Sequence, residues 1–144
     1  MSRAVMFLSA IVFTMLVHYP ARAATIDLDL QLLSGTTAGV MAADQQIGSG
    51  RISVMGFHDG FQIWSHAAKS SEQANRYVLY GKNSGHPLRI WIGGDGWANN
   101  MESGNGIITN ETGGGAVFKV YLDGEQLVAT DKYTFELTGG SFVN

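Results

Sequence analysis

The last segment of the chain is the feature that most constrains its fold, because it has the pattern of a strand and nothing after it covers that strand. Residues 133–137 alternate apolar and polar side chains, as a half-buried strand does, and the segment continues to Asn144. A strand at a sheet edge leaves N–H and C=O groups unpaired, and such groups need partners when they are buried. We therefore expect this chain to require a strand from another protein.

Residues 1–23 have the organisation of a secretory signal peptide. Residues 1–3 are a short basic segment, residues 4–17 are predominantly apolar, and residues 21–23 supply the small-x-small pattern of a cleavage site. The expected cleavage lies between Ala23 and Ala24. The 14-residue apolar stretch is shorter than the roughly 20 residues that a membrane-spanning helix needs.

The charge and cysteine content of residues 24–144 exclude several classes of function. This part of the chain has seven basic and twelve acidic residues, a formal charge of −5. Nucleic acid and anionic membrane surfaces are therefore poor candidate partners. The chain contains no cysteine, which excludes disulfides, thiol catalysis and cysteine-ligated metals. Burial and strand pairing must supply the stability.

Glycine content and hydrophobic periodicity indicate an all-β domain over residues 24–144. All nineteen glycines lie after residue 23, which favours turns and bulges over long helices. In the first predicted strand, Thr25 to Leu33, apolar side chains alternate with Asp27, Asp29 and Gln31. Further strands are predicted at residues 50–55, 61–64, 77–80, 88–92, 117–122 and 133–143, with a short one at 106–109.

The chain has no recognisable catalytic or metal-binding motif. His58, His66 and His86 lack the spacing of one or two turns that metal ligands usually show. No serine occupies a Gly-x-Ser-x-Gly elbow, and no glycine-rich stretch has the phosphate-binding form. We expect no enzymatic activity, no cofactor and no metal, and we expect these histidines in loops or at the surface.

Gly93-Gly94-Asp95-Gly96-Trp97 has two interpretations. As a binding loop, Asp95 and Trp97 would bind calcium or a sugar, and with Trp64 and Trp91 they would form a ligand surface. As a structural element, the glycines allow a tight bend at a strand end and Trp97 packs over the core. We favour the structural interpretation, because large aromatic side chains in small sandwiches are mostly buried.

Asp131-Lys132-Tyr133 resembles the tyrosine corner that opens the sixth strand of immunoglobulin-like sandwiches. In those domains a seventh strand follows, and here no residues remain to build one. Trp64 also matches the place of their core tryptophan. The resemblance implies an incomplete immunoglobulin-like sandwich that lacks its last strand and is completed by a donor strand.

A wider similarity extends over nearly all of residues 24–144. It is carried by five segments, Gly50-Arg51-Ile52, Gly60-Phe61-Gln62-Ile63-Trp64, Arg76-Tyr77-Val78, Leu88-Arg89-Ile90 and Gly93-Gly94-Asp95-Gly96-Trp97. In this order and spacing they resemble the tip subunits, or invasins, of Afa/Dr-type and Saf-type bacterial fimbriae. The absence of cysteine fits the Saf-like branch better, because Dr-type members join their second and last strands by a disulfide.

This family resemblance implies a set of partners. A periplasmic assembly chaperone binds the subunit and an outer-membrane usher passes it to the tip of a surface fibre, where it contributes to adhesion or host-cell invasion through a host-cell receptor. A strand from the repeating fimbrial subunit fills the groove between first and last strands. The expected groove residues are Ile26, Leu28, Leu30, Leu32, Tyr133, Phe135, Leu137 and Phe142.

The resemblance also implies a direction of strand exchange. Subunits that polymerise carry an extended N-terminal donor segment, whereas Ala24 leads directly into the first predicted strand. We therefore expect this chain to accept a strand and to donate none. The alternative hypothesis is a self-contained secreted sugar-binding sandwich that uses Trp64, Trp91, Asp95 and Trp97.

Overall fold

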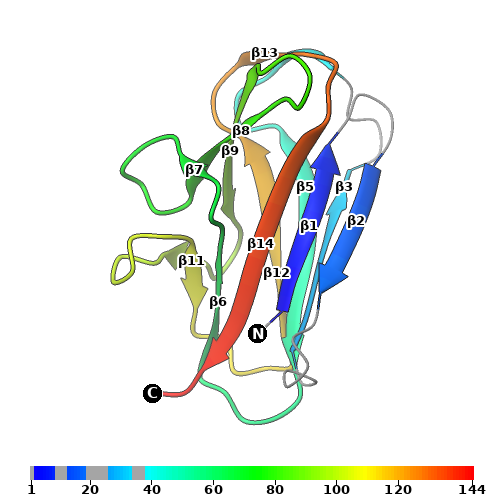
Figure 1. Ribbon diagram of the computed structural model, residues 1–144. Helices are drawn as coiled ribbons and strands as arrows, with labels where there is room; N and C mark the ends of the chain where they lie inside the picture. The colour runs from blue at the N-terminus through cyan, green and yellow to red at the C-terminus, as the bar shows by residue number, and fades with distance from the viewer. Residues whose placement is uncertain (1, 9–12, 19–25, 34–37) are drawn as a thin grey trace.

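The structure, a computed structural model, describes residues 2–8, 13–18, 26–33 and 38–144, which form strands joined by turns without an α-helix (Figure 1). The strands are β1 (Ser2–Leu8), β2 (Phe13–His18), β3 (Ile26–Leu32), β4 (Gly39–Met41), β5 (Gln46–Val54), β6 (Gly60–Trp64), β7 (Ala68–Lys69), β8 (Arg76–Tyr80), β9 (Pro87–Gly93), β10 (Ala98–Asn99), β11 (Ile107–Thr109), β12 (Gly115–Leu122), β13 (Gln126–Val128) and β14 (Tyr133–Phe142). Accordingly, this part of the chain has no helix that is long and apolar enough to cross a membrane.

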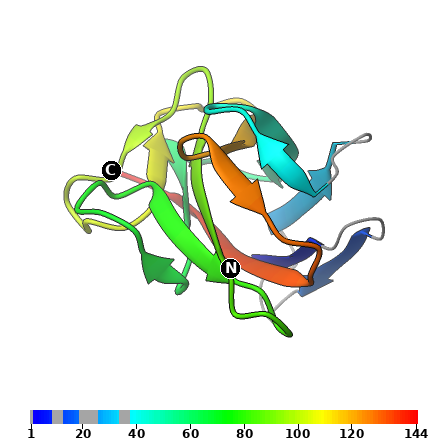
Figure 2. The same ribbon diagram turned by 90° about the horizontal axis from the view of Figure 1, so that it is seen from above.

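The described strands form two large sheets packed face to face. The first sheet has the order β10-β11-β6-β14-β1-β2, and the second has the order β3-β5-β12-β9-β8-β7. A third, two-stranded sheet of β4 and β13 closes one end of the sandwich (Figure 2). Every ladder is antiparallel, as expected for strands with one face toward a core and the other toward solvent.

The core lies between the inner faces of these two sheets. Leu28, Ile52 and Phe118 of the second sheet are fully buried, as are Phe61 and Phe135 of the first. The sheets come especially close at Gly139 of β14, where an added Cβ would lie 2.8 Å from Cδ1 of Ile52 and 3.2 Å from Cδ2 of Leu28. A larger residue at position 139 would push the sheets apart.

Most strands agree with the sequence prediction, and the differences have clear reasons. β5 begins at Gln46 instead of residue 50, because its early Gly-Ser-Gly segment pairs with both β3 and β12. Trp64 was expected to match a core position, and this prediction is wrong. Phe61 and Ile63 take the inward positions of β6, so the intervening alternation leaves Trp64 half-buried on the outer face.

The start of β14 has the hydrogen bond of a tyrosine corner. The Tyr133 hydroxyl donates to the carbonyl of Ala129 at 3.0 Å. Beside it, the buried carboxylate of Asp131 accepts the hydroxyl of Ser84 at 2.6 Å and the backbone N–H groups of Ser84 at 2.7 Å and Asn83 at 3.1 Å. These donors, with the Ser84 hydroxyl first, hold the pKa of Asp131 well below its usual range.

Replacing Asp131 with Asn should therefore destabilise the protein in a pH-dependent way. The folded-state pKa of Asp131 is depressed, so its contribution to stability is present above the unfolded-state pKa of about 4 and disappears as the pH falls toward the folded-state value. Denaturant unfolding of wild type and D131N should show a constant difference from about pH 7 to about pH 5 and a shrinking one below about pH 4.

Asp27, which is exposed on β3, provides the matched control for this experiment. The D27N variant should unfold like wild type near neutral pH. A difference between wild type and D131N that stayed the same down to about pH 2 would contradict the assigned role of the carboxylate.

Candidate functional site

The first half of β14 depends on β1 for its backbone pairing. β1 runs antiparallel to β14, with Ser2 opposite Gly139 and Leu8 opposite Tyr133. On its other edge, β14 pairs with β6 only from Thr138 to Phe142. Within the described ladders, residues 133–137 thus have β1 as their sole partner. The N-terminal segment of the chain occupies the edge that was expected to need a donor strand (Figure 1).

β1 also lies where the first sheet approaches the edge strand of the second. It contacts β3, the edge strand of the second sheet, as well as β14 of the first. Ala4 of β1 is fully buried opposite Leu137. A strand in this position therefore covers a groove whose walls are β3 and β14.

Seven of the eight predicted groove residues lie together on the inner faces of β3 and β14. Their side chains are buried, except for Leu32, which is partly buried against the same core, and they are Ile26, Leu28, Leu30, Leu32, Tyr133, Phe135 and Leu137. The ring of Phe135 packs against that of Tyr77, with centroids 5.8 Å apart. Burial raises the pKa of Tyr77 to about 12, so its phenol stays neutral and donates to Oδ1 of Asn105 at 2.6 Å.

Phe142 was predicted to be the eighth groove residue, and the structure places it on the opposite face. β14 continues in regular register through Gly139 and Gly140, so residue 142 is five positions from Leu137 and points away from the core. Its ring covers Gly60, where an added Cβ would collide with the ring carbons. Counting the strand period from Tyr133 would have revealed this error in the sequence alone.

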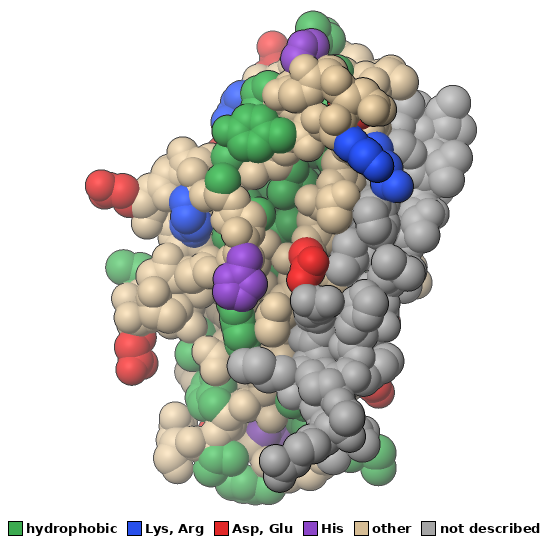
Figure 3. All heavy atoms as spheres, viewed as in Figure 1, with side chains coloured by type: hydrophobic (Ala, Val, Ile, Leu, Met, Phe, Trp, Pro, Cys, Tyr) green, Lys and Arg blue, Asp and Glu red, His purple; other side chains and the backbone are tan. Residues whose placement is uncertain are grey.

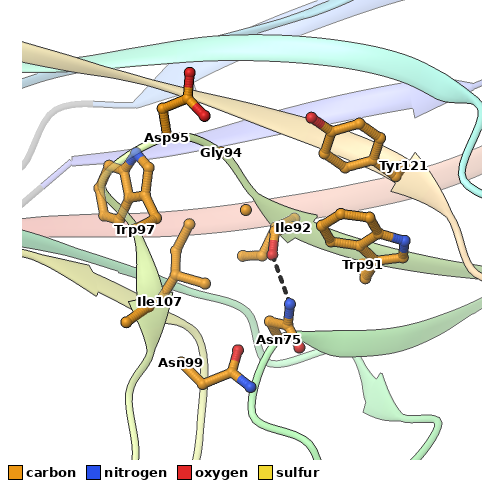
Figure 4. A pocket seen from close by; sticks show the side chains of 11 residues that line it. Asn75, Trp91, Ile92, Gly94, Asp95, Trp97, Asn99, Ile107 and Tyr121 are labelled. Atoms are coloured by element: carbon orange, nitrogen blue, oxygen red, sulfur yellow. Dashed lines mark hydrogen bonds between the residues drawn. The ribbon is translucent and has the colours of Figure 1, made fainter.

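Three of the four predicted ligand-surface residues surround one hollow between β9 and β12 of the second sheet and β10 and β11 of the first. Figure 4 shows Trp97 and Asp95 on one side and Trp91 with Tyr121 on the other, while Asn75, Ile92 and Ile107 line the space between them. Asn75 donates from Nδ2 to the carbonyl of Ile92 at 2.8 Å.

The aromatic rings of this hollow are largely engaged in contacts within the protein. Tyr121 stacks on Trp91 with centroids 4.1 Å apart, and the Arg76 guanidinium lies over the Trp91 ring at 5.8 Å. Arg76 and Tyr121 come from the strands on either side of β9, so both faces of Trp91 are covered. Trp97 packs on the core and donates from Nε1 to the carbonyl of Val117 at 2.8 Å. These contacts favour the structural interpretation of the segment.

Trp64, the fourth residue, belongs to a different surface. It lines a separate hollow on the outer face of β6, together with His66, Gln62, Asn100 and Ser103. The sequence prediction of one shared ligand surface is therefore wrong for Trp64. β6 and β9 belong to opposite sheets of the sandwich, so their outward side chains diverge.

The three histidines lie in separate loops between strands. They were expected in loops or at the surface; His58 lies in a loop but is buried, with only 4% of it exposed. Its ring lies 4.5 Å from that of Phe61, and Nδ1 is 3.0 Å from the carbonyl oxygen of Gly56. No group of three His, Asp or Glu side chains suited to a metal ion occurs among the described residues. The absence of metal and enzymatic activity stays a prediction.

The predicted cleavage residues Ala23 and Ala24 lie outside the described residues. The part of the predicted signal peptide that the structure describes forms the β1–β2 hairpin. Signal-peptide removal stays a prediction, and it would take the β1 strand away from β14.

Sequence comparison identifies the family. The model of the Enterobacteria AfaD invasin protein family matches residues 37–139. Protein AfaD of Escherichia coli is 32% identical over 117 residues, which cover 80% of each chain. The chain belongs to the AfaD invasin family. It is therefore an adhesin or invasin subunit of a chaperone-usher system, and such fimbrial subunits are exported to the cell surface.

Solved structures agree with this assignment. The Salmonella SafD adhesin superposes with a TM-score of 0.79 and 25% identity, covering 83% of this chain and 85% of SafD. HdaB, the minor tip subunit of the E. coli Hda pilus, gives a TM-score of 0.76 and 27% identity, with coverage of 84% and 85%. The predicted all-β, immunoglobulin-like sandwich and the Afa/Saf-type tip-subunit resemblance are confirmed.

The dependence of β14 on β1 can be tested in the full chain. Replacing Val5 and Met6 together with proline removes one backbone N–H from each edge of β1. Amide hydrogen exchange of residues 133–137 should then accelerate by at least about tenfold, while residues in the β6-paired half of β14 keep their protection.

The opposite residues of β2, Leu16 and Met15, provide a matched control. Proline at both positions breaks the β1–β2 pairing but leaves the β1–β14 ladder in place. Equal exchange of residues 133–137 in wild type and in the V5P/M6P variant would show that β1 does not protect them.

Proposed function

We propose that this protein is a fimbrial tip subunit that accepts a donor strand from the repeating subunit of the same fibre. The observation that carries this proposal is the pairing of residues 133–137, whose sole described ladder partner is β1. When the predicted signal peptide is removed, the same edge and groove require another strand. The donor strand precedes the first strand of its own domain and takes the place of β1 by strand addition.

The physical gain from such a strand comes from two sources. Its backbone pairs with groups of β14 that would otherwise be unsatisfied, and unpaired buried groups cost about 1–3 kcal/mol each. Its inward side chains cover the apolar groove of β3 and β14 at about 25 cal/mol per Å². Before a subunit supplies the strand, a periplasmic assembly chaperone protects the groove, and an outer-membrane usher carries out the transfer.

The similarity to HdaB and AfaD supports a position at the fibre tip and a contribution to adhesion or host-cell invasion through a host receptor. We also propose that the protein has no catalytic activity. The alternative of a self-contained sugar-binding sandwich is disfavoured, since both faces of Trp91 are covered and Trp64 lies on another surface.

A donor peptide should markedly stabilise residues 24–144. Adding the donor segment of the repeating subunit to the chaperone-released domain should stabilise it by several kcal/mol, because the strand buries apolar area and binds only the folded state. Thermal unfolding with and without peptide measures the effect, and a peptide of scrambled sequence is the control. A well-folded monomer whose thermal unfolding midpoint is unchanged by every donor peptide would refute strand acceptance.

The tip position predicts one direction of exchange. Mixing the protein with the intact repeating subunit should give a heterodimer that stays intact in SDS gel electrophoresis when the sample is not heated. Mixing it with a repeating subunit whose donor segment has been deleted should give none, because β3, the first described strand after the predicted cleavage, already pairs with β5 along its length. A stable complex in the second mixture would contradict the tip assignment.

A further inference from the structure

The direction of β1 distinguishes the two ends of the molecule. β1 starts beside Gly139 and ends beside Tyr133, so the chain leaves the groove at the end where β14 begins (Figure 1). A donor strand that takes this place in the direction of β1, and that precedes its own domain as in the proposed function, leaves the groove at the same end. At about 3.3 Å per residue, a short connection then brings the body of the donor close to this end.

The surface at the Tyr133 end presents apolar side chains. Val40 and Leu127 are directly opposite each other in the β4–β13 ladder, with 76% and 72% of their surfaces exposed. Tyr80, at the end of β8, is also exposed. We call Val40, Leu127 and Tyr80 the proximal surface. Figure 2, which views the molecule from this end, shows β4 and β13 in front.

Hydrogen bonds hold the proximal surface in place. The side chain of Gln126, next to Leu127, accepts the Arg89 N–H at 3.0 Å and donates to the Arg89 carbonyl at 2.8 Å, which fixes β13 to β9. The turn that follows Tyr80 is held by the bonds of Ser84 to Asp131. A surface that is already ordered loses little conformational entropy on contact with a partner.

The opposite end carries a second group of exposed apolar side chains. Met55 and Phe57 are 84% and 81% exposed in the loop between β5 and β6, and Val143 is exposed beside them near the C-terminus. The Asp59 N–H donates to the Phe142 carbonyl at 2.7 Å, which joins this loop to the end of β14. Figure 3 shows hydrophobic side chains at both ends of the molecule. We call Met55, Phe57 and Val143 the distal surface.

We propose that the proximal surface contacts the body of the strand-donating subunit and that the distal surface is the free end of the fibre. The groove and the proximal surface then form one continuous interface, because the donor strand leaves the groove at Tyr133 beside the β4–β13 sheet. Val40 and Leu127 lie directly opposite each other, so a donor body at this end would cover both exposed aliphatic side chains and remove them from water. This inference rests on the proposed strand exchange.

The absence of cysteine makes a direct test possible, since an introduced cysteine is the only thiol of the chain. The variants L127C and F57C carry matched, exposed positions at the two ends. Each full-length variant is expressed with the other proteins of its fimbrial assembly system, and the assembled fibres are treated with a thiol-reactive benzophenone and irradiated. We expect a covalent cross-link to the repeating subunit from residue 127 and none from residue 57.

A second measurement uses purified complexes. The V40S/L127S variant should release the whole repeating subunit about tenfold faster than wild type does, while its affinity for the bare donor peptide stays unchanged. The M55S/F57S variant should release the repeating subunit at the wild-type rate and bind the donor peptide with the wild-type affinity.

The outcomes separate the two proposals. A cross-link from residue 57 instead of 127 would show that the donor leaves at the other end, and no cross-link from either position within an intact heterodimer would show that the bodies do not touch. Either result overturns the inference while the proposed function stands. If neither peptide nor subunit binds, the proposed function fails and the inference fails with it.

Discussion

The backbone ladder along the first half of β14 is the interaction on which the rest of the structure depends. This half of the strand closes the core from one side, with Tyr133, Phe135 and Leu137 pointing inward. On the described ladders its N–H and C=O groups pair only with β1. Backbone groups at a buried sheet edge need hydrogen-bond partners. The strand that pairs with this edge is therefore a structural part of the domain, whichever chain it belongs to.

The hydrogen bonds around Asp131 determine where that ladder begins. Its carboxylate accepts hydrogen bonds from the backbone N–H groups of Asn83 and Ser84. The Tyr133 hydroxyl donates a hydrogen bond to the carbonyl of Ala129. These contacts join the start of β14 to the β8–β9 turn without a covalent link. Gly139 then allows the two sheets to approach closely. Contacts within the domain thus hold β14 both at its start and where it passes over β3 and β5.

The sequence predicted the fold class and most strands because period-two alternation is strong in β3, β8, β9 and β14. It also predicted the inward orientation of seven residues of β3 and β14, since inward positions follow directly from that alternation. Phe142 was misplaced, because the alternation that starts at Tyr133 continues unbroken through Gly139 and Gly140 and turns residue 142 to the outer face.

The remaining features depend on long-range pairing and could not be predicted from local patterns. Trp64 lies outside because β6 directs Phe61 and Ile63 inward. The stack of Arg76, Trp91 and Tyr121 arises only when three strands come into register. The two three-residue strands of the proximal surface are too short to show a period.

The antiparallel register of β1 has a mechanical consequence. Hydrogen bonds between antiparallel strands lie perpendicular to the strands, so a force that pulls an inserted strand along its axis loads all of them at once instead of opening them one by one. Seven consecutive register pairs join β1 to β14. In a chain without cysteine, a fibre attached through this ladder resists tension by shear of many weak bonds together, and its strength grows with the length of the inserted strand.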